Sequence, residues 1–194
     1  MITTFYPPHA FGGDGRFVRD LSEALADRGH EVDVVYLRDA YRARSAEPTG
    51  WRPRLPPGLR VHGLKSRAGR LALVAAHQTG FPWPVARTLE RHLGRTDFDV
   101  VHFHNISLFG PAVLRYGRGV KLLTLHEHWL LCEAHTLFRM NAAPCERPAC
   151  VRCALTYGRP PQWWRRTQMV PHALAHVDRV LAPSRAILDR HRAA

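Results

Sequence analysis

The chain alternates short apolar runs with amphipathic stretches along most of its length. The runs are rich in valine, leucine and phenylalanine and have the length of buried strands. Proline, glycine and polar clusters bound them, which favours strands over segments of a buried helix. The pattern predicts strands at residues 2–6, 31–37, 59–64, 99–104, 121–125 and 178–183.

Apolar residues recur at helical spacing between these runs. In the first such stretch we expect Asp14 to cap the start of a helix and Gly29 to end it in a left-handed conformation. Strands that alternate with helices in this order predict an α/β fold, in which a parallel sheet has helices on both faces. A length of 194 residues suits one domain over residues 1–194. Further helices are predicted at residues 68–79, 84–94 and 107–116, and after residue 184.

A glycine-rich loop, H-A-F-G-G-D-G, joins the first strand to the first helix. Glycine lets the backbone approach a ligand closely, and a helix N-terminus offers N–H groups and the positive end of a dipole. Gly12 and Gly13 are therefore candidate phosphate-binding residues. The loop is not the dinucleotide fingerprint, because the third glycine of G-x-G-x-x-G is replaced by Val18 when the pattern starts at Gly13. A tight strand–helix turn also requires glycine, so both interpretations stay open.

Polar residues follow two of the predicted parallel strands. His104 and Asn105 come at the end of one, and His126 and Glu127 come at the end of the next. Ligands of open α/β sheets bind at the carboxyl ends of strands, so we expect these side chains to contact substrate. His102 shares a strand face with His104, but it lies mid-strand and is interpreted as a core histidine and not as a metal ligand.

All four cysteines lie in one loop, residues 127–160, with the spacing C-x12-C-x4-C-x2-C. Four clustered thiols can close a tetrahedral zinc site, so the spacing predicts a structural zinc ion that braces the loop. Unligated or disulfide-bonded thiols are the alternative. Catalytic zinc of the H-E-x-x-H type is excluded because Leu130 stands where the second histidine would be. The predicted metal ligands are Cys132, Cys145, Cys150 and Cys153.

The formal charge of +12 would suit nucleic acid, an anionic membrane surface or a phosphate-bearing substrate. The arginines are scattered, and aromatic and basic residues are not interleaved on one sheet face, so no nucleic acid partner is expected. The longest apolar run, residues 71–76, is too short to span a membrane, and we expect a soluble cytoplasmic protein. Trp163 and Trp164 stand beside two arginines, which suits peripheral contact with the inner face of a membrane or packing of a helix over a loop.

Five motifs, in order, resemble the N-terminal domain of family-four glycosyltransferases. They cover nearly the whole chain, and together they are specific although single motifs recur elsewhere. They are Y-P-P-H-A-F-G-G-D-G, A-L-A-D-R-G-H-E-V-D-V-V, F-D-V-V-H-F-H-N, T-L-H-E-H-W followed by a cysteine, and V-D-R-V-L-A-P-S.

The resemblance implies a Rossmann-like domain that forms the N-terminal half of a GT-B architecture. Such enzymes transfer a sugar, here of hexosyl type, from a nucleotide sugar to a glycan or lipid-linked acceptor with retention of configuration. The resemblance assigns Gly12 and Gly13 to the donor phosphates and His126 to the donor sugar, and Glu127 fills a position that is often acidic. We expect Asp14, His104 and Asn105 beside the substrate.

The C-terminal donor-binding half of such an enzyme is absent from these residues. We therefore expect a fragment or one half of a split enzyme that is inactive alone and is completed in cis or by a separate chain. A zinc-stapled basic module that binds nucleic acid and a non-catalytic interaction domain are the alternative functions.

Overall fold

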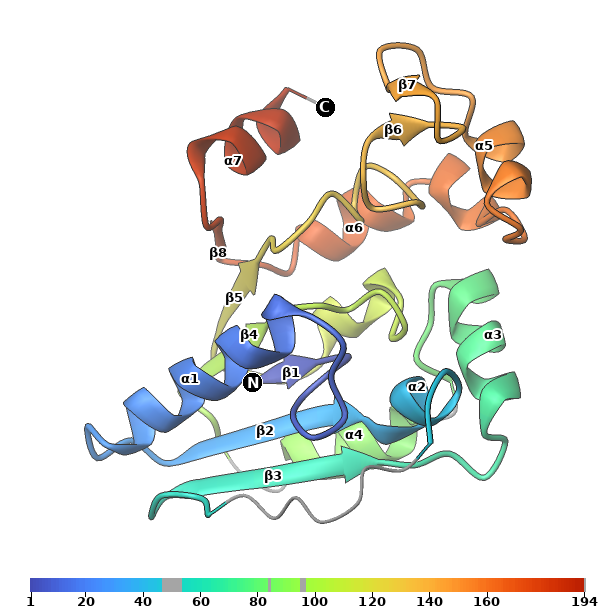
Figure 1. Cartoon of the computed structure of the whole chain (residues 1–194). Coiled ribbons are helices and arrows are strands. Elements are labelled where there is room, and N and C mark those ends of the chain that lie inside the picture. Colours follow the sequence, from blue (N-terminus) through green and yellow to red (C-terminus); the bar gives the residue numbers. More distant parts are fainter. Residues whose placement is uncertain (47–53, 84, 95–96, 194) are drawn as a thin grey trace.

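The computed structural model describes residues 1–46, 54–83, 85–94 and 97–193. Its main feature is a six-stranded sheet in the order β3-β2-β1-β4-β5-β8, and every neighbouring pair is parallel. This is the strand order of a Rossmann-like sheet. Successive strands are added on one side of β1 as far as β3, and β4 then starts the other side. The predicted α/β fold is confirmed (Figure 1). The strands are β1 (Ile2–Thr3), β2 (Val32–Leu37), β3 (Leu59–Leu64), β4 (Val100–Phe103), β5 (Val120–Thr124) and β8 (Arg179–Leu181).

Helices connect the strands, and a small antiparallel hairpin lies outside the main sheet. The α-helices are α1 (Gly13–Ala26), α2 (Arg38–Arg42), α3 (Arg70–Thr79), α4 (Ala86–Gly94), α5 (Cys150–Thr156), α6 (Met169–Leu174) and α7 (Arg185–Arg192). The shorter elements are the 3-10 turns η1 (Pro111–Arg115) and η2 (Trp163–Arg166), and the hairpin strands β6 (Phe138–Arg139) and β7 (Ala143–Pro144).

Strand β2 shows why both faces of the sheet are covered. All six of its residues are buried, and successive side chains point to opposite faces. Val34 and Tyr36 pack with α1, whereas Val35 and Leu37 pack in the larger core that contains α4. Figure 1 shows α4 behind β2 and β3. A strand buried on both sides reads as a continuous apolar run, and this run was visible in the sequence.

Helix α1 begins two residues earlier than predicted. Its N-cap is Gly12 and not Asp14, which lies inside the first turn. The expected cap at Asp14 is therefore wrong, because its carboxylate accepts hydrogen bonds from the adjacent Gly15 N–H and from Asn105 instead. The predicted end is confirmed: Gly29 has φ +87°, and the next N–H bonds back to the Leu25 carbonyl in a left-handed helix termination.

Several predicted elements were longer than those in the structure. The first strand stops at Thr3, because the chain turns back on itself between Tyr6 and His9, which exchange backbone hydrogen bonds. The helix expected from 107 to 116 is only the 3-10 turn η1, and the start expected at residue 84 lies outside the described residues. Helices α2, α5 and α6 were not predicted. Ser184 caps α7 as expected, since its hydroxyl accepts the Ile187 N–H.

The turn before η1 is a site where only glycine fits. Gly110 has φ +83° and ψ 159°, and an added Cβ would lie 2.3 Å from the backbone of Gly80. We expect Gly110→Ala to lower the free energy of unfolding by more than about 2 kcal/mol, through backbone strain and this overlap. Denaturant unfolding measures the loss. Gly94→Ala is the matched control and should be nearly neutral, because a Cβ there meets nothing within 4 Å. Equal stabilities of the two variants would contradict the assignment.

Candidate functional site

The loops at the carboxyl edge of the sheet enclose a cleft of about 1080 Å³. One side comes from the β1–α1 loop with the start of α1, and others come from the ends of β4 and β5 and from α3. Five of the residues predicted to bind substrate or catalyse line it, whereas Gly12 does not, and buried His104 reaches it only through its contact with His126. The five are Gly13, Asp14, Asn105, His126 and Glu127.

Asn105 connects three separate segments of this edge. Its amide N–H₂ donates to Asp14 Oδ2 at 2.8 Å and to Glu127 Oε1 at 3.4 Å. Its carbonyl oxygen accepts the N–H and the hydroxyl of Ser107 at 3.1 and 2.7 Å. These partners set the amide orientation, since the two carboxylates require donors. Asn105 therefore holds the glycine loop, the end of β4 and the end of β5 together.

His104 and His126 form a second contact between the same two strand ends. Nδ1 of His104 lies 3.1 Å from Nε2 of His126. Nε2 of His104 is buried and has no hydrogen-bond partner in the described part of the chain. A buried acceptor without a hydrogen-bond partner costs less free energy than a buried donor without one. The favoured tautomers are thus a His104 that donates from Nδ1 and a His126 whose own proton is on Nδ1.

Burial keeps these imidazoles neutral. It is the main cause that lowers the pKa of His104 well below the ordinary 6.5, and His102 and His126 lower it further. Burial also lowers the pKa of His126, against the opposing effect of Asp14 and Glu127. The His102 ring lies 4.0 Å from that of His104 and bonds to Thr124, as expected for a core histidine. A neutral His126 can donate one hydrogen bond without bringing charge to a ligand.

The glycine loop leaves space beside the start of α1. Gly12 has no side chain and provides no cap, and in the first turn the Asp14 carboxylate accepts only the Gly15 N–H. A Cβ added at Gly13 would meet nothing within 4 Å, and its φ is not in the positive region. The glycine at this position is therefore not required by packing or by backbone strain within the chain. The open space at Gly13 faces the cleft.

Sequence reasoning missed a group of cleft residues that come from loops and α3. Glu133 is buried, its carboxylate accepts the Gln162 N–H at 3.2 Å, and burial raises its pKa. His135 Nδ1 lies 2.7 Å from Glu127 Oε1. His77 and Arg159 line the same cleft. No periodic pattern marks these positions, because long-range packing alone brings them to the site.

Trp164 and Arg165 are structural. Trp164 is buried and donates its indole N–H to the His77 carbonyl, and the guanidinium of Arg165 lies over the Trp129 and Trp164 rings. Arg165 also donates to the carbonyls of Trp129 and Leu130. The interpretation as packing over a loop is confirmed for this pair. Trp163 remains 55% exposed.

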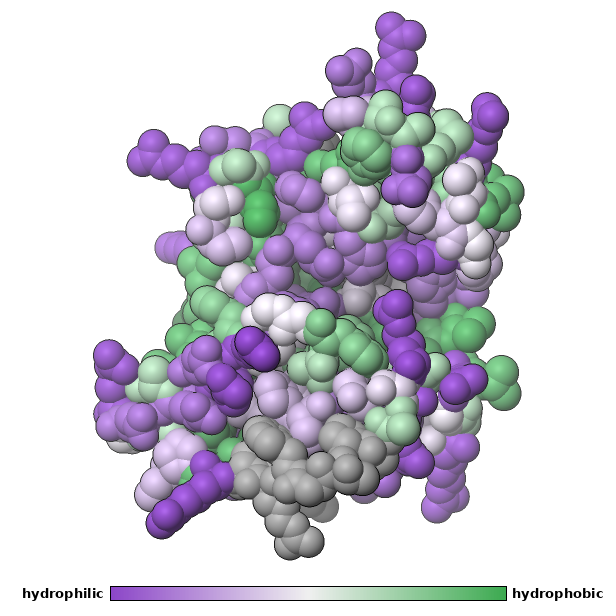
Figure 2. Space-filling view, viewed as in Figure 1, coloured by the Kyte–Doolittle hydropathy of each residue, from purple (hydrophilic) through white to green (hydrophobic). Residues whose placement is uncertain are grey.

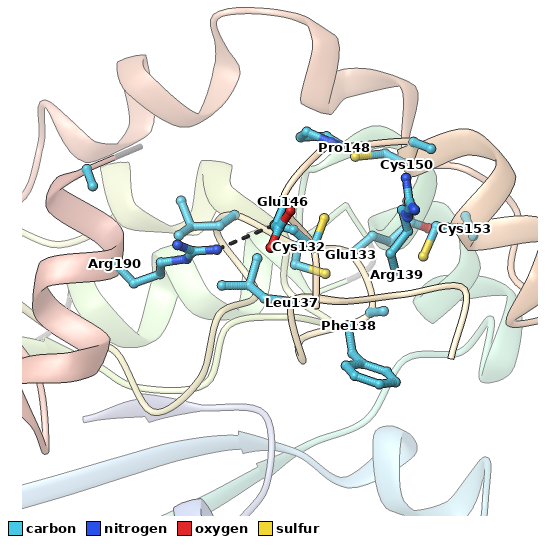
Figure 3. Close-up of a pocket in the computed structure, with 16 residues that line it drawn as sticks. Cys132, Glu133, Leu137, Phe138, Arg139, Glu146, Pro148, Cys150, Cys153 and Arg190 are labelled. Atoms are coloured by element: carbon cyan, nitrogen blue, oxygen red, sulfur yellow. Dashed lines mark hydrogen bonds between the residues drawn. The ribbon is translucent and has the colours of Figure 1, made fainter. Parts of the chain in front are cut away.

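The four cysteines surround a second cavity, of about 320 Å³, next to the cleft (Figure 3). All four are free thiols. Among the described residues, the one group of three or more potential ligand side chains with all ligand atoms within 4.8 Å is Asp33, His62 and His92. The sequence did not indicate that group, and it lies outside the cleft. The predicted cysteine site stays a prediction.

The comparison with known families decides the classification. The sequence profile described as Glycosyltransferase Family 4 matches residues 11–194. The chain belongs to glycosyltransferase family 4. The resemblance inferred from the five motifs is confirmed, and so is the general glycosyltransferase class.

One relative of this family-four domain is an uncharacterized 42.6 kDa protein in the cps region of Klebsiella pneumoniae. It is 25% identical over 129 residues, which are 65% of this chain and 35% of the relative. The matched part thus spans about a third of that protein. No solved structure matches the chain.

Figure 2 shows hydrophilic side chains projecting around the outline of this face of the glycosyltransferase domain. Within the described residues, no helix has both the length and the apolar character needed to cross a membrane.

Asn105→Asp tests the network at the cleft. The substitution replaces the donating N–H₂ by a carboxylate oxygen that faces Asp14 and Glu127. We expect a loss of about 2–4 kcal/mol in the free energy of unfolding at neutral pH, from repulsion and lost hydrogen bonds. The loss should shrink at acidic pH, where the introduced carboxylate takes up a proton. Asn141→Asp, at an exposed residue outside the network, should cost far less. A pH-independent loss would argue against the assigned amide orientation.

His102 should make stability depend on pH. Burial lowers its pKa to about 4, whereas the unfolded chain titrates near the ordinary 6.5. The stabilisation is therefore complete above pH 6.5 and is lost as pH falls toward 4, by up to about 3 kcal/mol. His102→Gln should flatten this part of the profile in denaturant unfolding between pH 7 and 4. His30→Gln, at an exposed histidine, should keep the parent slope. Identical slopes for both variants would show that His102 does not titrate in this way.

Proposed function

We propose that this domain is the acceptor-side half of a retaining glycosyltransferase. The enzyme would transfer a hexosyl group from a nucleotide sugar to a glycan or a lipid-linked acceptor. The observation that carries the proposal is the meeting of the open helix start at Gly13, the Asn105 network and His126 in one cleft. Family membership supports the reaction class.

The start of α1 suits the donor phosphates. The N-cap residue Gly12 provides no side-chain cap, and the positive end of the helix dipole favours an anion, although the Gly15 N–H is already bonded to Asp14. Asp14 lies in the same turn, but its carboxylate is engaged by Asn105. A pyrophosphate that develops charge in the transition state needs cations as well as N–H groups. We propose that these cations come from a second Rossmann-like domain, in the same polypeptide or in a separate chain.

His126 suits the donor sugar. Because His104 donates a hydrogen bond to Nε2 of His126, the proton of His126 is on Nδ1. From Nδ1 the neutral ring can donate a hydrogen bond to a sugar hydroxyl. Phe17 packs edge-on against this ring at 5.1 Å. The proposed role is orientation of the sugar. In a retaining transfer the leaving phosphate can take the acceptor proton, so a further base on this domain is not required.

The remaining walls suit an acceptor with sugar character. Phe11 and Trp129 supply aromatic surface, while Glu133, His135 and Arg159 supply hydrogen-bonding groups. Apolar faces beside a few placed polar groups are the usual composition of a small-molecule site. For a lipid-linked acceptor we propose peripheral contact with the inner, anionic membrane face, which exposed Trp163 and the charge of +12 would favour. The cytoplasmic location remains a prediction.

Gly13→Val provides the test. The full-length gene product is assayed with a panel of uridine and guanosine diphosphate sugars, with release of nucleoside diphosphate and the anomeric configuration of the product as readouts. In the parent protein we expect release of nucleoside diphosphate and a product that retains the anomeric configuration of the donor. The valine should reduce kcat/KM for the donor by about 100-fold or more, because it fills space needed by the phosphates. Stability should be unchanged, since no protein atom lies within 4 Å of the added Cβ.

The control is Gly94→Val, at a glycine with equally free surroundings outside the cleft. It should retain parent activity. If the full-length product neither binds nor cleaves any nucleotide sugar of the panel, the proposed function is wrong. If Gly13→Val retains full activity, the donor phosphates do not approach this glycine.

A further inference from the structure

The cysteine loop, residues 127–160, has little apolar support of its own. From residue 131 to residue 160, only Glu133 and Ala154 are buried. The loop nevertheless forms defined elements, the β6–β7 hairpin and α5. An isolated two-stranded hairpin and a helix of two turns are marginal in water without added packing or a cross-link. Segments with so small a core are commonly held by disulfides or by a structural metal.

The backbone of the loop is also strained. The non-glycine residues with positive φ in the described chain all fall between residues 135 and 141. Left-handed backbone costs free energy at residues with a Cβ, and it persists where the surroundings impose it. Neither apolar packing nor a glycine offsets the strain of this turn, so another constraint is needed to maintain its backbone conformation. The residues are His135 with φ 70°, Leu137 with 52°, Met140 with 48° and Asn141 with 55°.

The four thiols lie where such a constraint would act. They come from three separate parts of the loop and line one cavity of about 320 Å³ (Figure 3). Cys150 and Cys153 stand three residues apart in the first turn of α5, which places them on one helix face. The N–H of strained Met140 donates to Cys153 Sγ at 3.2 Å. A backbone N–H directed at sulfur would help to stabilise a metal-bound thiolate.

We propose that Cys132, Cys145, Cys150 and Cys153 together bind one structural zinc ion. Four thiolates close a tetrahedral site and leave no position for water, so the role is structural and not catalytic. Zinc–sulfur bonds of about 2.3 Å place the sulfurs about 3.8 Å apart. No three of them lie within 4.8 Å of one another in the structure. Rotation about a Cα–Cβ bond moves a sulfur by about 3 Å, so zinc binding would require the thiols to rotate toward the cavity.

The zinc ion would brace one wall of the cleft. Glu133 and Ala134 line both the cysteine cavity and the cleft. The adjacent His135 pairs with Glu127, which in turn accepts from Asn105. Loss of the metal would therefore loosen this wall. That consequence for activity rests on the proposed function, whereas metal binding itself does not.

Another metal-capable group in the described chain must be separated from this site. Asp33, His62 and His92 lie within 4.8 Å of one another. The Asp33 carboxylate is already occupied by Arg60, whose Nε lies 2.6 Å from Oδ1. A cation there would have to displace a guanidinium, so the cysteines are the preferred site. Asp33→Asn is consequently an informative control.

The experiment measures zinc in the purified full-length gene product by elemental analysis. We expect about one zinc per chain, and below about a tenth of that in each of the four Cys→Ser variants. Asp33→Asn should retain the full amount. Cobalt exchanged into the parent should give the visible bands of a tetrahedral ion and a sulfur-to-metal charge-transfer band.

A second measurement covers variants that do not fold. Titration of the folded parent with a mercurial should release zinc in proportion to the thiols modified, and all four thiols should be needed for full release. The proposal is overturned if the parent contains no zinc, if mass analysis shows disulfides in its place, or if zinc is lost from Asp33→Asn but kept in the cysteine variants. Since zinc content is independent of sugar transfer, failure here leaves the proposed function intact.

Discussion

Backbone pairing between β1 and β4 is the contact on which the site depends. Strand β1 has only two residues, and the bonds that flank it continue the alignment: the His104 N–H donates to the Ile2 carbonyl, and the Thr4 N–H donates to the Asn105 carbonyl at 2.6 Å. The Thr4 hydroxyl bonds to the same carbonyl. This register places Asn105 beside the loop that leaves β1. A shift of one residue would turn its side chain to the other face of the sheet.

The cleft that results combines the start of α1 with acidic, basic and neutral polar groups. The histidines stay uncharged because burial outweighs the nearby carboxylates. The carboxylates of Asp14 and Glu127 are engaged with Asn105. The cleft thus presents neutral rings and hydrogen-bonded carboxylates, and Arg44 and Arg159 are the Arg or Lys side chains that line it among the described residues.

The loop after β5 illustrates how a fold extends beyond its core. The sheet stabilises the chain as far as Trp129, which is buried against Trp164 and Arg165. Beyond that point apolar burial nearly ceases, although the segment still forms part of the cleft wall. Such a wall depends on specific polar contacts, and these respond to solution conditions more readily than a packed core does.

The sequence by itself determined the sheet, the order of its elements and the strand ends that carry chemistry. Periodicity and apolar runs report local geometry and burial, and parallel strands must meet at a common edge, so His126 and Asn105 could be assigned to one site. Family membership also followed from local motifs.

Only the tertiary structure decided which partners those residues have. Asp14 turned out to bond with Asn105, 91 residues away, instead of capping its helix. Glu133 and His135 line the cleft although their loop has no periodic pattern. Asp33 of β2 lies 3.7 Å from His92 of α4, measured between Oδ2 and Nε2. These contacts join residues that are far apart in the chain, and their energies depend on burial and exact distance. Neither quantity is encoded in local sequence spacing.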